Sequence, residues 1–413
     1  MDAVSELQWR GLIADATDLE GIRKLPSGSC FYVGFDPTAS SLQVGNLVPL
    51  ISELHLARCG LKPLILFGGA TGYIGDPSGK RSERQFLSPE DIHRNVSLQV
   101  EQARKIFSRV GVEAEFVNNY DWTKSVTFLD FLRDTGKYFT VNYMLQKESV
   151  KTRLEGDGIS FTEFSYMLMQ AFDFYHLYST KSCKLQVGGS DQWGNITSGL
   201  ELIRKKGGSD AYALSFPLLL NSDGKKFGKS ESGTMWLDPS TTSPYKFHQF
   251  WLNVEDKDVV RYLKIFTFLT EVEILVLEER IKSEPQKREA QIVLADLMCE
   301  LIHGKDACIN AKRSASVLFG GSIEGLSAND LLEIFAEVPS SSLPRVKAKG
   351  LDTPSFIVES GFIKSKSEVR RLITSGGLYI NNERVSEATP LNLDGELVIL
   401  RSGKKNYHLV KLT

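Results

Sequence analysis

Short apolar runs alternate with longer amphipathic segments through the first half of the chain. The runs at residues 31–35, 63–67 and 184–187 are bounded by polar or glycine-rich stretches and predict strands. Between the first two runs, residues 47–57 have apolar positions at helical spacing and predict a crossover helix. Strands that alternate with helices indicate β-α-β units, so we predict an α/β domain with a Rossmann-type parallel sheet over residues 1–240.

The pattern changes in the second half. Residues 241–320 have helical periodicity, as in DVVRYLKIFTFL, and predict a helical middle domain. Residues 321–350 are rich in Ser, Pro and Gly and predict a linker with a hinge. Residues 351–413 predict a small α+β domain with the helix SKSEVRRLITS, the strand LYI, and the strands ELVIL and YHLVKL around the basic turn SGKKN. A length of 413 residues exceeds one comfortable core and agrees with several domains.

Composition excludes several classes of protein. Hydrophobic residues make up 42% and charged residues 24%, as in ordinary globular proteins, and no apolar run has the length of a membrane span. The N-terminal segment lacks the apolar core of a signal peptide, so we expect a cytoplasmic protein without a membrane partner. The cysteines lack C-x-x-C spacing, which argues against a zinc site or disulfide framework; they are Cys30, Cys59, Cys183, Cys299 and Cys308.

Charge is distributed unevenly along the chain. The formal net charge is −2, but residues 344–413 have a balance of +5. A basic tail on an acidic body predicts that the tail contacts a polyanion.

Glycine clusters follow two of the predicted strands, GGATGYIG after Phe67 and GGSDQWGN after Val187. Ligands bind outside the carboxyl ends of strands in open α/β sheets, where glycine lets the backbone approach them closely. We therefore expect a binding site at this edge of the sheet.

The stretch YVGFDPTASSLQVGN runs from a predicted strand through a turn into a predicted helix. The hydroxyls of Thr38, Ser40 and Ser41 suit a helix start, and a helix N-terminus favours phosphate. Gln43 and Asn46 lie three residues apart on one face and offer amide donors. An ordinary capped helix is the alternative.

The stretch DGKKFGKSESGT is dense in lysine and glycine but lacks the first glycine of a Walker A loop. A mobile loop with Lys226 and Lys229 three residues apart is suited to close over a polyphosphate and neutralise a leaving group. A solvated surface loop is the alternative.

Tyr166, Gln170 and Asp173 form a polar stripe on the otherwise apolar helix FTEFSYMLMQAFDF. Buried polar groups need partners, and an amphoteric ligand would supply them. The surrounding apolar side chains argue against the alternative of a solvent-exposed face.

Four motifs in order, FDPTASSLQVGNL, GGATGYIGDPSGK, GGSDQWGNI and KFGKS, resemble those of the bacterial-type tyrosyl-tRNA synthetases, which are class I aminoacyl-tRNA synthetases. The resemblance covers essentially the whole chain. It places QVGN, residues 43–46, at the H-I-G-H signature and KFGKS, residues 226–230, at the K-M-S-K-S signature.

The resemblance implies a protein-biosynthesis ligase that attaches L-tyrosine to tRNA(Tyr) through tyrosyl-adenylate, releasing pyrophosphate and then AMP. Tyr32 and Asp173 would bond the tyrosine hydroxyl, and tyrosyl-tRNA synthetases are themselves a standard example of the discrimination against phenylalanine that such a site gives. The other implied tyrosine-binding residues are Asp76, Tyr166 and Gln170 at the ammonium group and Gln192 near the carboxylate.

ATP is the second implied substrate, with Mg²⁺ on its triphosphate. The implied ATP-binding residues are Gly34, Asp36, Gly189, Asp191 and Lys229. The implied catalytic residues are Thr38, Gln43, Asn46, Lys80, Arg84, Lys226, Lys229 and Ser230. No cluster of carboxylates in the sequence predicts a dedicated metal site.

Both histidines of the H-I-G-H signature are replaced, by Gln43 and Asn46. Amides also donate hydrogen bonds to phosphate, so we predict that activity persists. The alternative is an RNA-binding paralogue with weakened or lost catalysis. A tryptophanyl-tRNA synthetase fits the phenol-binding pair less well, and a nucleotidyltransferase that does not use tRNA leaves the basic tail unexplained.

The C-terminal domain resembles a small RNA-binding module shared with a ribosomal small-subunit protein. Its implied tRNA-binding residues are Lys364, Lys366, Arg370, Arg371, Lys404 and Lys405, although a solvated basic surface is the alternative. The resemblance also implies a homodimer formed through an insertion near residues 121–155 and an anticodon-arm-binding role for residues 241–320. Nothing predicts a DNA partner.

Overall fold

The computed structural model describes residues 2–78, 86–156, 158–220, 227–230, 233–318, 320–336, 338–386, 391, 393, 395–403 and 406–413. The chain forms two compact units, one of residues 1–243 and 250–304 and the other of residues 244–249 and 305–413. No described helix is both long and apolar enough to cross a membrane.

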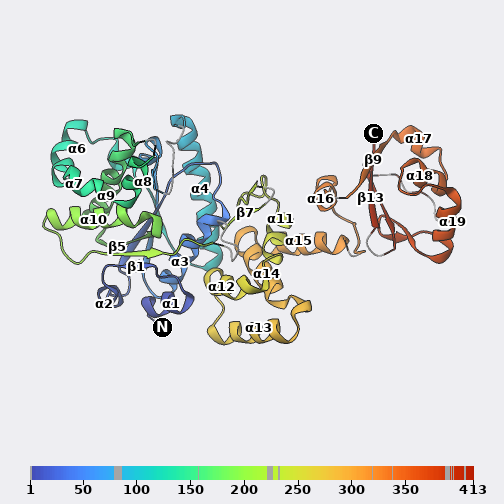
Figure 1. Ribbon diagram of the computed structural model, residues 1–413, viewed down its shortest axis with the longest axis horizontal. Coiled ribbons are helices and arrows are strands. Elements are labelled where there is room, and N and C mark those ends of the chain that lie inside the picture. The colour runs from blue at the N-terminus through green and yellow to red at the C-terminus, as the bar shows by residue number, and fades with distance from the viewer. Residues whose placement is uncertain are drawn as a thin grey trace. The chain divides into compact units, whose positions relative to one another are not determined.

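A six-stranded sheet in the order β1-β6-β5-β2-β3-β4 forms the centre of the first unit (Figure 1). Its strands are β1 (Asp15–Ala16), β2 (Cys30–Phe35), β3 (Lys62–Phe67), β4 (Glu115–Asn118), β5 (Cys183–Gly189) and β6 (Tyr212–Phe216). All pairings are parallel except that of β1 with β6. This confirms the predicted parallel α/β architecture, and the three predicted strands are the inner parts of β2, β3 and β5.

The strand order reverses between β2 and β5. From β2 the chain moves outward through β3 to β4, and it then returns to β5 on the other side of β2. The connections that leave the carboxyl ends of β2 and β5 therefore diverge, and a crevice opens between them. This position is where a ligand is expected.

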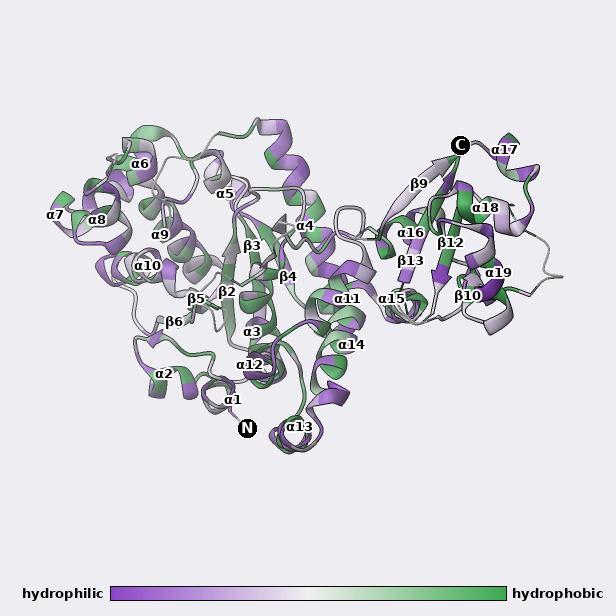
Figure 2. Cartoon of the chain, turned by 45° about the vertical axis from the view of Figure 1, so that its right-hand side comes forward, coloured by the Kyte–Doolittle hydropathy of each residue, from purple (hydrophilic) through white to green (hydrophobic). Residues whose placement is uncertain are grey.

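Alternate residues of the central strands face opposite layers of helices. The crossover helix is α3 (Leu47–Arg58), and the long helices after it are α9 (Phe161–Lys181) and α10 (Trp193–Lys205). Tyr32 and Leu64 pack with Phe174 of α9 and Ile203 of α10. The neighbouring strand residues point the other way, toward the side on which Figure 1 shows α3. The strands β2 and β3 are largely green in Figure 2, as expected for a sheet covered on both faces.

Local signals set the bounds of the long helices. In α4 (Pro89–Val110), the Ser88 side chain accepts the Asp91 N–H, and Gly111 ends the helix at a φ of 71°. The other helices of the first unit are α1 (Ala3–Arg10), α2 (Leu19–Arg23), α5 (Tyr120–Thr123), α6 (Phe128–Asp134), α7 (Val141–Leu145), α8 (Glu148–Leu154), α12 (Asp256–Phe266), α13 (Glu271–Ser283) and α14 (Glu289–His303). Helix α11 (Pro244–Leu252) contributes residues to both units.

The second unit contains a five-stranded sheet in the order β11-β10-β12-β13-β9. Its strands are β9 (Ser340–Leu343), β10 (Leu378–Ile380), β11 (Glu383–Arg384), β12 (Leu397–Ser402) and β13 (Asn406–Leu412). Its helices are α15 (Lys305–Val317), α16 (Ala328–Ile334), α17 (Arg345–Lys349), α18 (Thr353–Glu359) and α19 (Lys366–Ser375). The predicted C-terminal helix corresponds to α19, and the strands LYI, ELVIL and YHLVKL correspond to β10, β12 and β13.

The segment 321–350, predicted as a linker, contains α16, β9 and α17. Strand β9 pairs in parallel with β13, and Ile334 and Phe335 pack with Tyr407 and Leu409. The apolar run LLEIFAEV at residues 331–338 is a helical signal that the Ser, Pro and Gly around it obscured. The role of this segment as an interdomain connection stays a prediction.

Candidate active site

A pocket of about 440 Å³ lies at the carboxyl ends of β2 and β5, where the strand order reverses. It brings together residues from every motif of the first unit that the sequence singles out. The predicted site residues that line it are Tyr32, Gly34, Asp36, Thr38, Gln43, Asn46, Asp76, Tyr166, Gln170, Asp173, Gly189, Asp191 and Gln192.

The remaining predicted residues of this site are described less fully. Lys80, Arg84 and Lys226 lie outside the described residues. Lys229 and Ser230 are described as backbone only, in strand β7 (Lys229–Ser230), which pairs antiparallel with β8 (Gly233–Thr234). Their contacts with a nucleotide stay predictions.

Tyr32 and Asp173 are buried at one end of the pocket. The Tyr32 hydroxyl has no hydrogen-bond partner among the described residues, and burial, followed by the nearby charge of Asp173, raises the pKa of Tyr32 well above its ordinary value. Burial also raises the pKa of Asp173 to about 7. A buried phenol and a buried carboxyl that line the same pocket can both hydrogen-bond to one further hydroxyl.

Two residues that sequence reasoning missed hold Asp173 in place. Asn119 Nδ2 donates to one carboxylate oxygen at 2.9 Å, and Trp122 Nε1 donates to the other at 2.8 Å. Both hydrogen bonds lower the pKa of Asp173 and oppose the effect of burial. Asn119 is itself fixed, because its Oδ1 accepts the Ala70 N–H at 2.7 Å. The available signal was position, since NNYDW follows the carboxyl end of a parallel strand.

Asp76 forms the centre of a second polar group. Gln192 Nε2 donates to Asp76 Oδ2 at 2.5 Å, and the Ser78 N–H donates to Asp76 Oδ1 at 3.0 Å. Asn195, also missed from the sequence, lies 3.2 Å from Gln192 Oε1 through its Nδ2. Asp76 is 7% exposed and its carboxyl is held in place by these hydrogen bonds, so it offers oriented acceptor oxygens at the pocket wall that suit an ammonium group.

Tyr166 and Asp36 are joined directly. The Tyr166 hydroxyl donates to Asp36 Oδ2 at 2.9 Å, and Thr71 Oγ1 donates to Asp36 Oδ1 at 2.9 Å. Burial and then the Asp36 charge raise the pKa of Tyr166 well above its ordinary value. A residue predicted for the amino acid and one predicted for the nucleotide are therefore joined by a hydrogen bond in the pocket wall.

The last three residues of QVGN form a short 3₁₀ turn, η1 (Val44–Asn46), which runs directly into α3. Asn46 Oδ1 accepts the Gln43 N–H at 2.9 Å, so the NH₂ half of this amide does not take part in the cap. The prediction that Thr38, Ser40 and Ser41 begin the helix is wrong, because Gln43 and Asn46 close the first turn. Ser41 Oγ instead donates to the Leu42 carbonyl at 2.7 Å.

Three amide side chains of α4 hold the turn that precedes QVGN. Asn95 Nδ2 donates to the Pro37 carbonyl at 3.0 Å and Gln99 Nε2 donates to the Ala39 carbonyl at 2.8 Å. Gln102 Oε1 accepts the Leu42 N–H at 2.9 Å. Their spacing places them on one face of α4, which fixes the path of the chain between Asp36 and Gln43.

The KFGKS and QVGN segments are backbone neighbours. The Val44 N–H donates to the Met235 carbonyl at 2.9 Å, just beyond β8, and Gln43 forms an isolated bridge with Trp236. Gly228 has a φ of +84°, and a Cβ built there would lie 3.2 Å from the Gly45 nitrogen. Glycine at both positions lets the two signatures approach each other.

Comparison with known proteins identifies the family. A model described as "tRNA synthetases class I (W and Y)" matches residues 27–320, and one described as "Tyrosine--tRNA ligase SYY-like C-terminal domain" matches residues 330–410. The "Tyrosine--tRNA ligase" of Geobacillus kaustophilus is 47% identical over 423 aligned residues, covering 100% of both chains. The chain belongs to the tyrosine–tRNA ligase family. This confirms the predicted family and enzyme class.

Further relatives agree with tyrosine–tRNA ligase. The "Tyrosine--tRNA ligase" of Opitutus terrae is 46% identical over 424 aligned residues and 100% of both chains. The crystal structure of a C-terminally truncated mitochondrial tyrosyl-tRNA synthetase from Aspergillus nidulans has a TM-score of 0.70 at 32% identity and covers 77% of this chain and 94% of its own. The names of these relatives specify tyrosine and a ligase, so they do not support the tryptophanyl alternative or the RNA-binding paralogue.

The predicted tRNA-binding residues of this tyrosine–tRNA ligase family member lie on the second unit. Lys364, Lys366, Arg370 and Arg371 are exposed at α19 and just before it. Lys404 and Lys405 lie outside the described residues. Four of the six predicted cations are therefore exposed at α19 or next to it.

Proposed function

We propose that the pocket binds L-tyrosine and MgATP side by side and joins them before the tyrosyl group passes to tRNA(Tyr). The observation that supports this most directly is that one pocket is lined by Tyr32 and Asp173 and also by Gln43 and Asn46. The tyrosine carboxylate attacks the α-phosphorus, and the bond to the β-phosphate oxygen breaks, so pyrophosphate leaves. A ribose hydroxyl at the end of tRNA then attacks the acyl carbon, and AMP leaves. Both steps depend on positioning and charge stabilisation rather than on a protein nucleophile.

Tyrosine lies with its hydroxyl between Tyr32 and Asp173. The Tyr32 hydroxyl, which has no hydrogen-bond partner among the described residues, gains one when this ligand binds. Phenylalanine would leave the buried Tyr32 hydroxyl without a partner and would offer no hydroxyl to Asp173, which is the basis of discrimination. The ammonium group of tyrosine is bound by Asp76, Tyr166 and Gln170. Gln192 lies near its carboxylate.

ATP enters as its Mg²⁺ complex, so the ion is part of the substrate and is held through phosphate oxygens. The backbone at Gly34 and Gly189 admits the nucleoside, and Asp36 and Asp191 face it from the pocket wall. The phosphates lie toward the start of α3, where Thr38, Gln43 and Asn46 donate hydrogen bonds. Charge on the departing pyrophosphate is neutralised by the cations and the hydroxyl of two motifs, Lys80, Arg84, Lys226, Lys229 and Ser230.

The tRNA is held mainly by the later parts of the chain. Residues 241–320 contact the anticodon arm, and residues 351–413 bind RNA through exposed cations. Phosphate contacts of this kind give affinity that falls steeply with salt. The cytoplasmic location expected from the sequence suits a translation enzyme and stays a prediction.

Two copies pair through the insertion near residues 121–155. Helices α6 to α9 are held together by an apolar cluster that includes Phe139, Met144 and Met167. Outside this cluster, Phe128 is 67% exposed and Leu129 is 75% exposed. Apolar side chains gathered at this exposure are typical of a surface that a partner covers.

The test is tyrosine-dependent exchange of pyrophosphate into ATP. We expect tyrosine, and neither tryptophan nor phenylalanine, to support exchange in the intact chain. Lys229→Ala is expected to lower the exchange kcat by about 100-fold with little change in the Kd for tyrosine, because that lysine acts on the phosphates only. Exchange driven equally well by phenylalanine, or an unaltered rate in Lys229→Ala, would contradict the proposal.

A further inference from the structure

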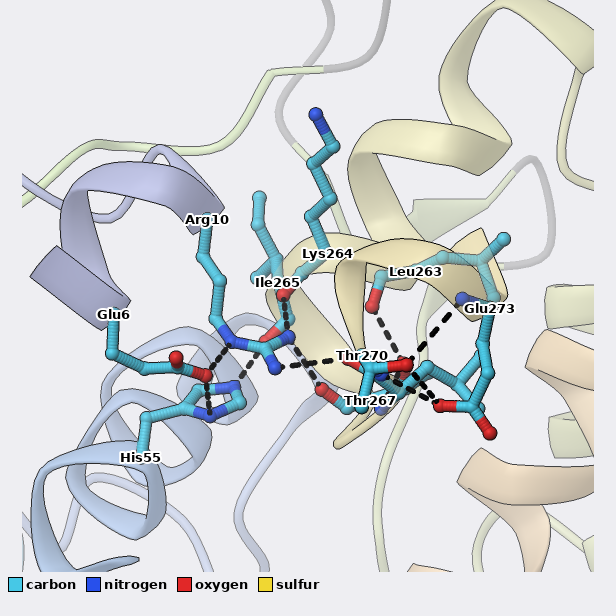
Figure 3. Close-up of polar contacts among 10 residues, drawn as sticks. Glu6, Arg10, His55, Leu263, Lys264, Ile265, Thr267, Thr270 and Glu273 are labelled. Atoms are coloured by element: carbon cyan, nitrogen blue, oxygen red, sulfur yellow. Dashed lines mark hydrogen bonds and ion pairs between the residues drawn. The ribbon is translucent and has the colours of Figure 1, made fainter. Parts of the chain in front are cut away.

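Arg10, the last residue of α1, has its guanidinium buried against the end of α12, and Arg10 as a whole is 4% exposed (Figure 3). Its Nη1 donates to the carbonyls of Lys264 at 2.7 Å and Thr267 at 2.8 Å, and its Nη2 donates to the Leu269 carbonyl at 3.0 Å. The last carbonyls of a helix have no partner within the helix. Arg10 supplies donors to this helix end and to the turn that follows it.

The same joint includes α3. Glu6 Oε1 accepts from Arg10 Nε at 2.7 Å and lies 3.9 Å from Nδ1 of His55. The other ring nitrogen of His55 lies 3.4 Å from the Ile265 carbonyl, and burial lowers the pKa of His55 to about 3, so its ring is neutral at ordinary pH. Figure 3 shows α1, α3 and α12 meeting at this point. One of the three, α3, begins at the QVGN signature.

Helix α12 also carries two of the rings that anchor the other signature, and a third belongs to α11. Phe227, the second residue of KFGKS, is 8% exposed and lines the pocket. Its ring stacks on Phe266 with centroids 5.2 Å apart, and lies 5.0 Å from the ring of Tyr262 and 5.6 Å from that of Trp251. The next residue, Gly228, is the one whose Cβ would abut Gly45. A shift of α12 would therefore disturb the packing of Phe227 and, with it, the position of KFGKS relative to QVGN.

We propose that Arg10 is a positioning residue for adenylate formation: by tying the end of α12 to α1 and α3, it fixes Phe227 and sets the KFGKS backbone beside QVGN. The proposal rests on the proposed role of KFGKS at the phosphates. Without the guanidinium, three carbonyls lose their donor in a buried site, and the last turn of α12 must move to find water or other partners. A displacement of about 1 Å at catalytic groups can cost about 100-fold in rate.

Tyrosine binding provides an internal reference. The phenol end of the pocket is held by β2, α9 and the segment after β4, through Tyr32, Asp173, Asn119 and Trp122. A clamp on α12 should therefore affect the phosphate end and spare the phenol end. A purely structural arginine would weaken both ends together.

The experiment measures the Kd for tyrosine by intrinsic fluorescence and the exchange kcat and KM for ATP in Arg10→Met and Arg10→Lys. We expect the Kd for tyrosine to stay within about twofold and the exchange kcat to fall about 10- to 100-fold in Arg10→Met, with Arg10→Lys between it and the parent chain. Lysine keeps the charge but cannot form the fork of bonds to three carbonyls.

Arg109→Met is the matched control. Arg109 of α4 donates to the carbonyls of Leu301 at 3.0 Å and Ile302 at 2.5 Å, at the end of α14. Arg109 is thus another arginine that donates to the carbonyls at the end of a neighbouring helix. The helix it closes is α14, whereas the rings of Tyr262 and Phe266 that contact Phe227 belong to α12. We expect its exchange kcat to stay within about twofold of the parent value.

Phe227→Leu tests the other end of the same path. If Arg10 acts through Phe227, the double variant Arg10→Met/Phe227→Leu loses less activity than the product of the two single losses. The proposal is overturned if the double loss equals the product, if the Kd for tyrosine weakens in step with kcat, or if Arg109→Met matches Arg10→Met. Should Arg10→Met fail to fold, Arg10→Lys with Phe227→Leu gives the same cycle, and parent-like exchange in Arg10→Lys overturns the proposal. Failure of Lys229→Ala to lower exchange would count against the role of KFGKS and is a separate result.

Discussion

Asp173 shows how a single residue that is proposed to confer substrate specificity can lower the stability of the fold. Its carboxyl is 3% exposed, and the partners that oppose desolvation are the neutral donors Asn119 and Trp122. Because burial raises its pKa to about 7, from an ordinary value of 3.8, the folded state holds the proton more tightly than the unfolded state. The sign follows: this group favours folding only at low pH, and that contribution is lost as the pH rises from about 4 through about 7.

Asp173→Asn is therefore expected to stabilise the fold at pH 8 and to abolish strong tyrosine binding. The gain in the free energy of unfolding should be on the order of 2–4 kcal/mol at pH 8 and under about 1 kcal/mol at pH 4, because at pH 4 the folded carboxyl is neutral and the unfolded one is only partly ionised. Urea unfolding at the two pH values measures this difference. In the parent chain the Kd for tyrosine should rise as the pH falls below about 7, and equal stabilisation at both pH values would contradict the account.

Single residues of the site differ in how far the sequence could reveal them. Tyr166, Gln170 and Asp173 stand out as polar positions within an apolar helix, so pattern alone selects them. Asn119 and Trp122 lie in a short segment without periodicity, and their role depends on β4 pairing beside β3 to bring them to α9. A contact made across the sheet edge leaves no local pattern, which is why sequence reasoning missed both.

Helices and strands also differ in how far the sequence predicts them. The strands β2, β3 and β5 and the helix α3 follow from apolar spacing, since burial on both faces sets that spacing. The start of α3 does not, because hydroxyl residues compete for the cap and only the folded turn decides among them. In the sequence, the amide side chains of α4 look like an ordinary polar helix face. Only the structure shows that Asn95, Gln99 and Gln102 bond the turn between Asp36 and Gln43.

Asn46 supports an element-scale prediction about the altered signature. Its oxygen caps the first turn at Gln43, and its NH₂ half is the part available to a phosphate. A neutral histidine can divide its two ring nitrogens in the same way, one accepting the N–H and the other donating. Asn46→His should therefore keep the exchange kcat within about threefold, whereas Asn46→Ala should lose about 1 kcal/mol of stability with the cap and roughly 100-fold in kcat.

Pyrophosphate exchange and thermal unfolding measure the two effects separately. Ser40→Ala is the control, because Ser40 lies in the preceding turn and does not cap the helix. A parent-like rate in Asn46→Ala would show that the amide donates nothing to the transition state.

At the scale of the whole molecule, the exposed apolar residues of α6 predict a monomer–dimer switch. Phe128→Glu with Leu129→Glu places two charges on side chains that are 67% and 75% exposed, so the fold of the single chain should tolerate them. In a two-fold symmetric interface each substitution occurs twice. Burying the resulting unpaired charges would cost binding free energy and separate the two copies. Light scattering should show the parent chain as a dimer and the variant as a monomer.

Val346→Glu is the matched control, since Val346 is 88% exposed in the second unit. It should leave the dimer intact. A variant at α6 that stays dimeric at micromolar concentration would place the interface elsewhere.

The second unit supports the last prediction, which concerns tRNA. Truncation after residue 350 is a poor test, because β9 lies before that point and pairs with β13, and Phe335 packs with Tyr407.

Charge reversal in the full chain avoids this damage: Arg370→Glu with Arg371→Glu changes exposed residues of α19 only. We expect exchange to be unchanged, kcat/KM for tRNA charging to fall at least 10-fold at physiological salt, and the salt dependence of tRNA affinity to lose about 2 from its log–log slope. Lys105→Glu, an exposed lysine of α4 paired with Glu101, is the control for added negative charge and should leave charging within about twofold. Undiminished charging in the α19 variant would mean that this surface is merely solvated, and the basic tail would need another polyanion.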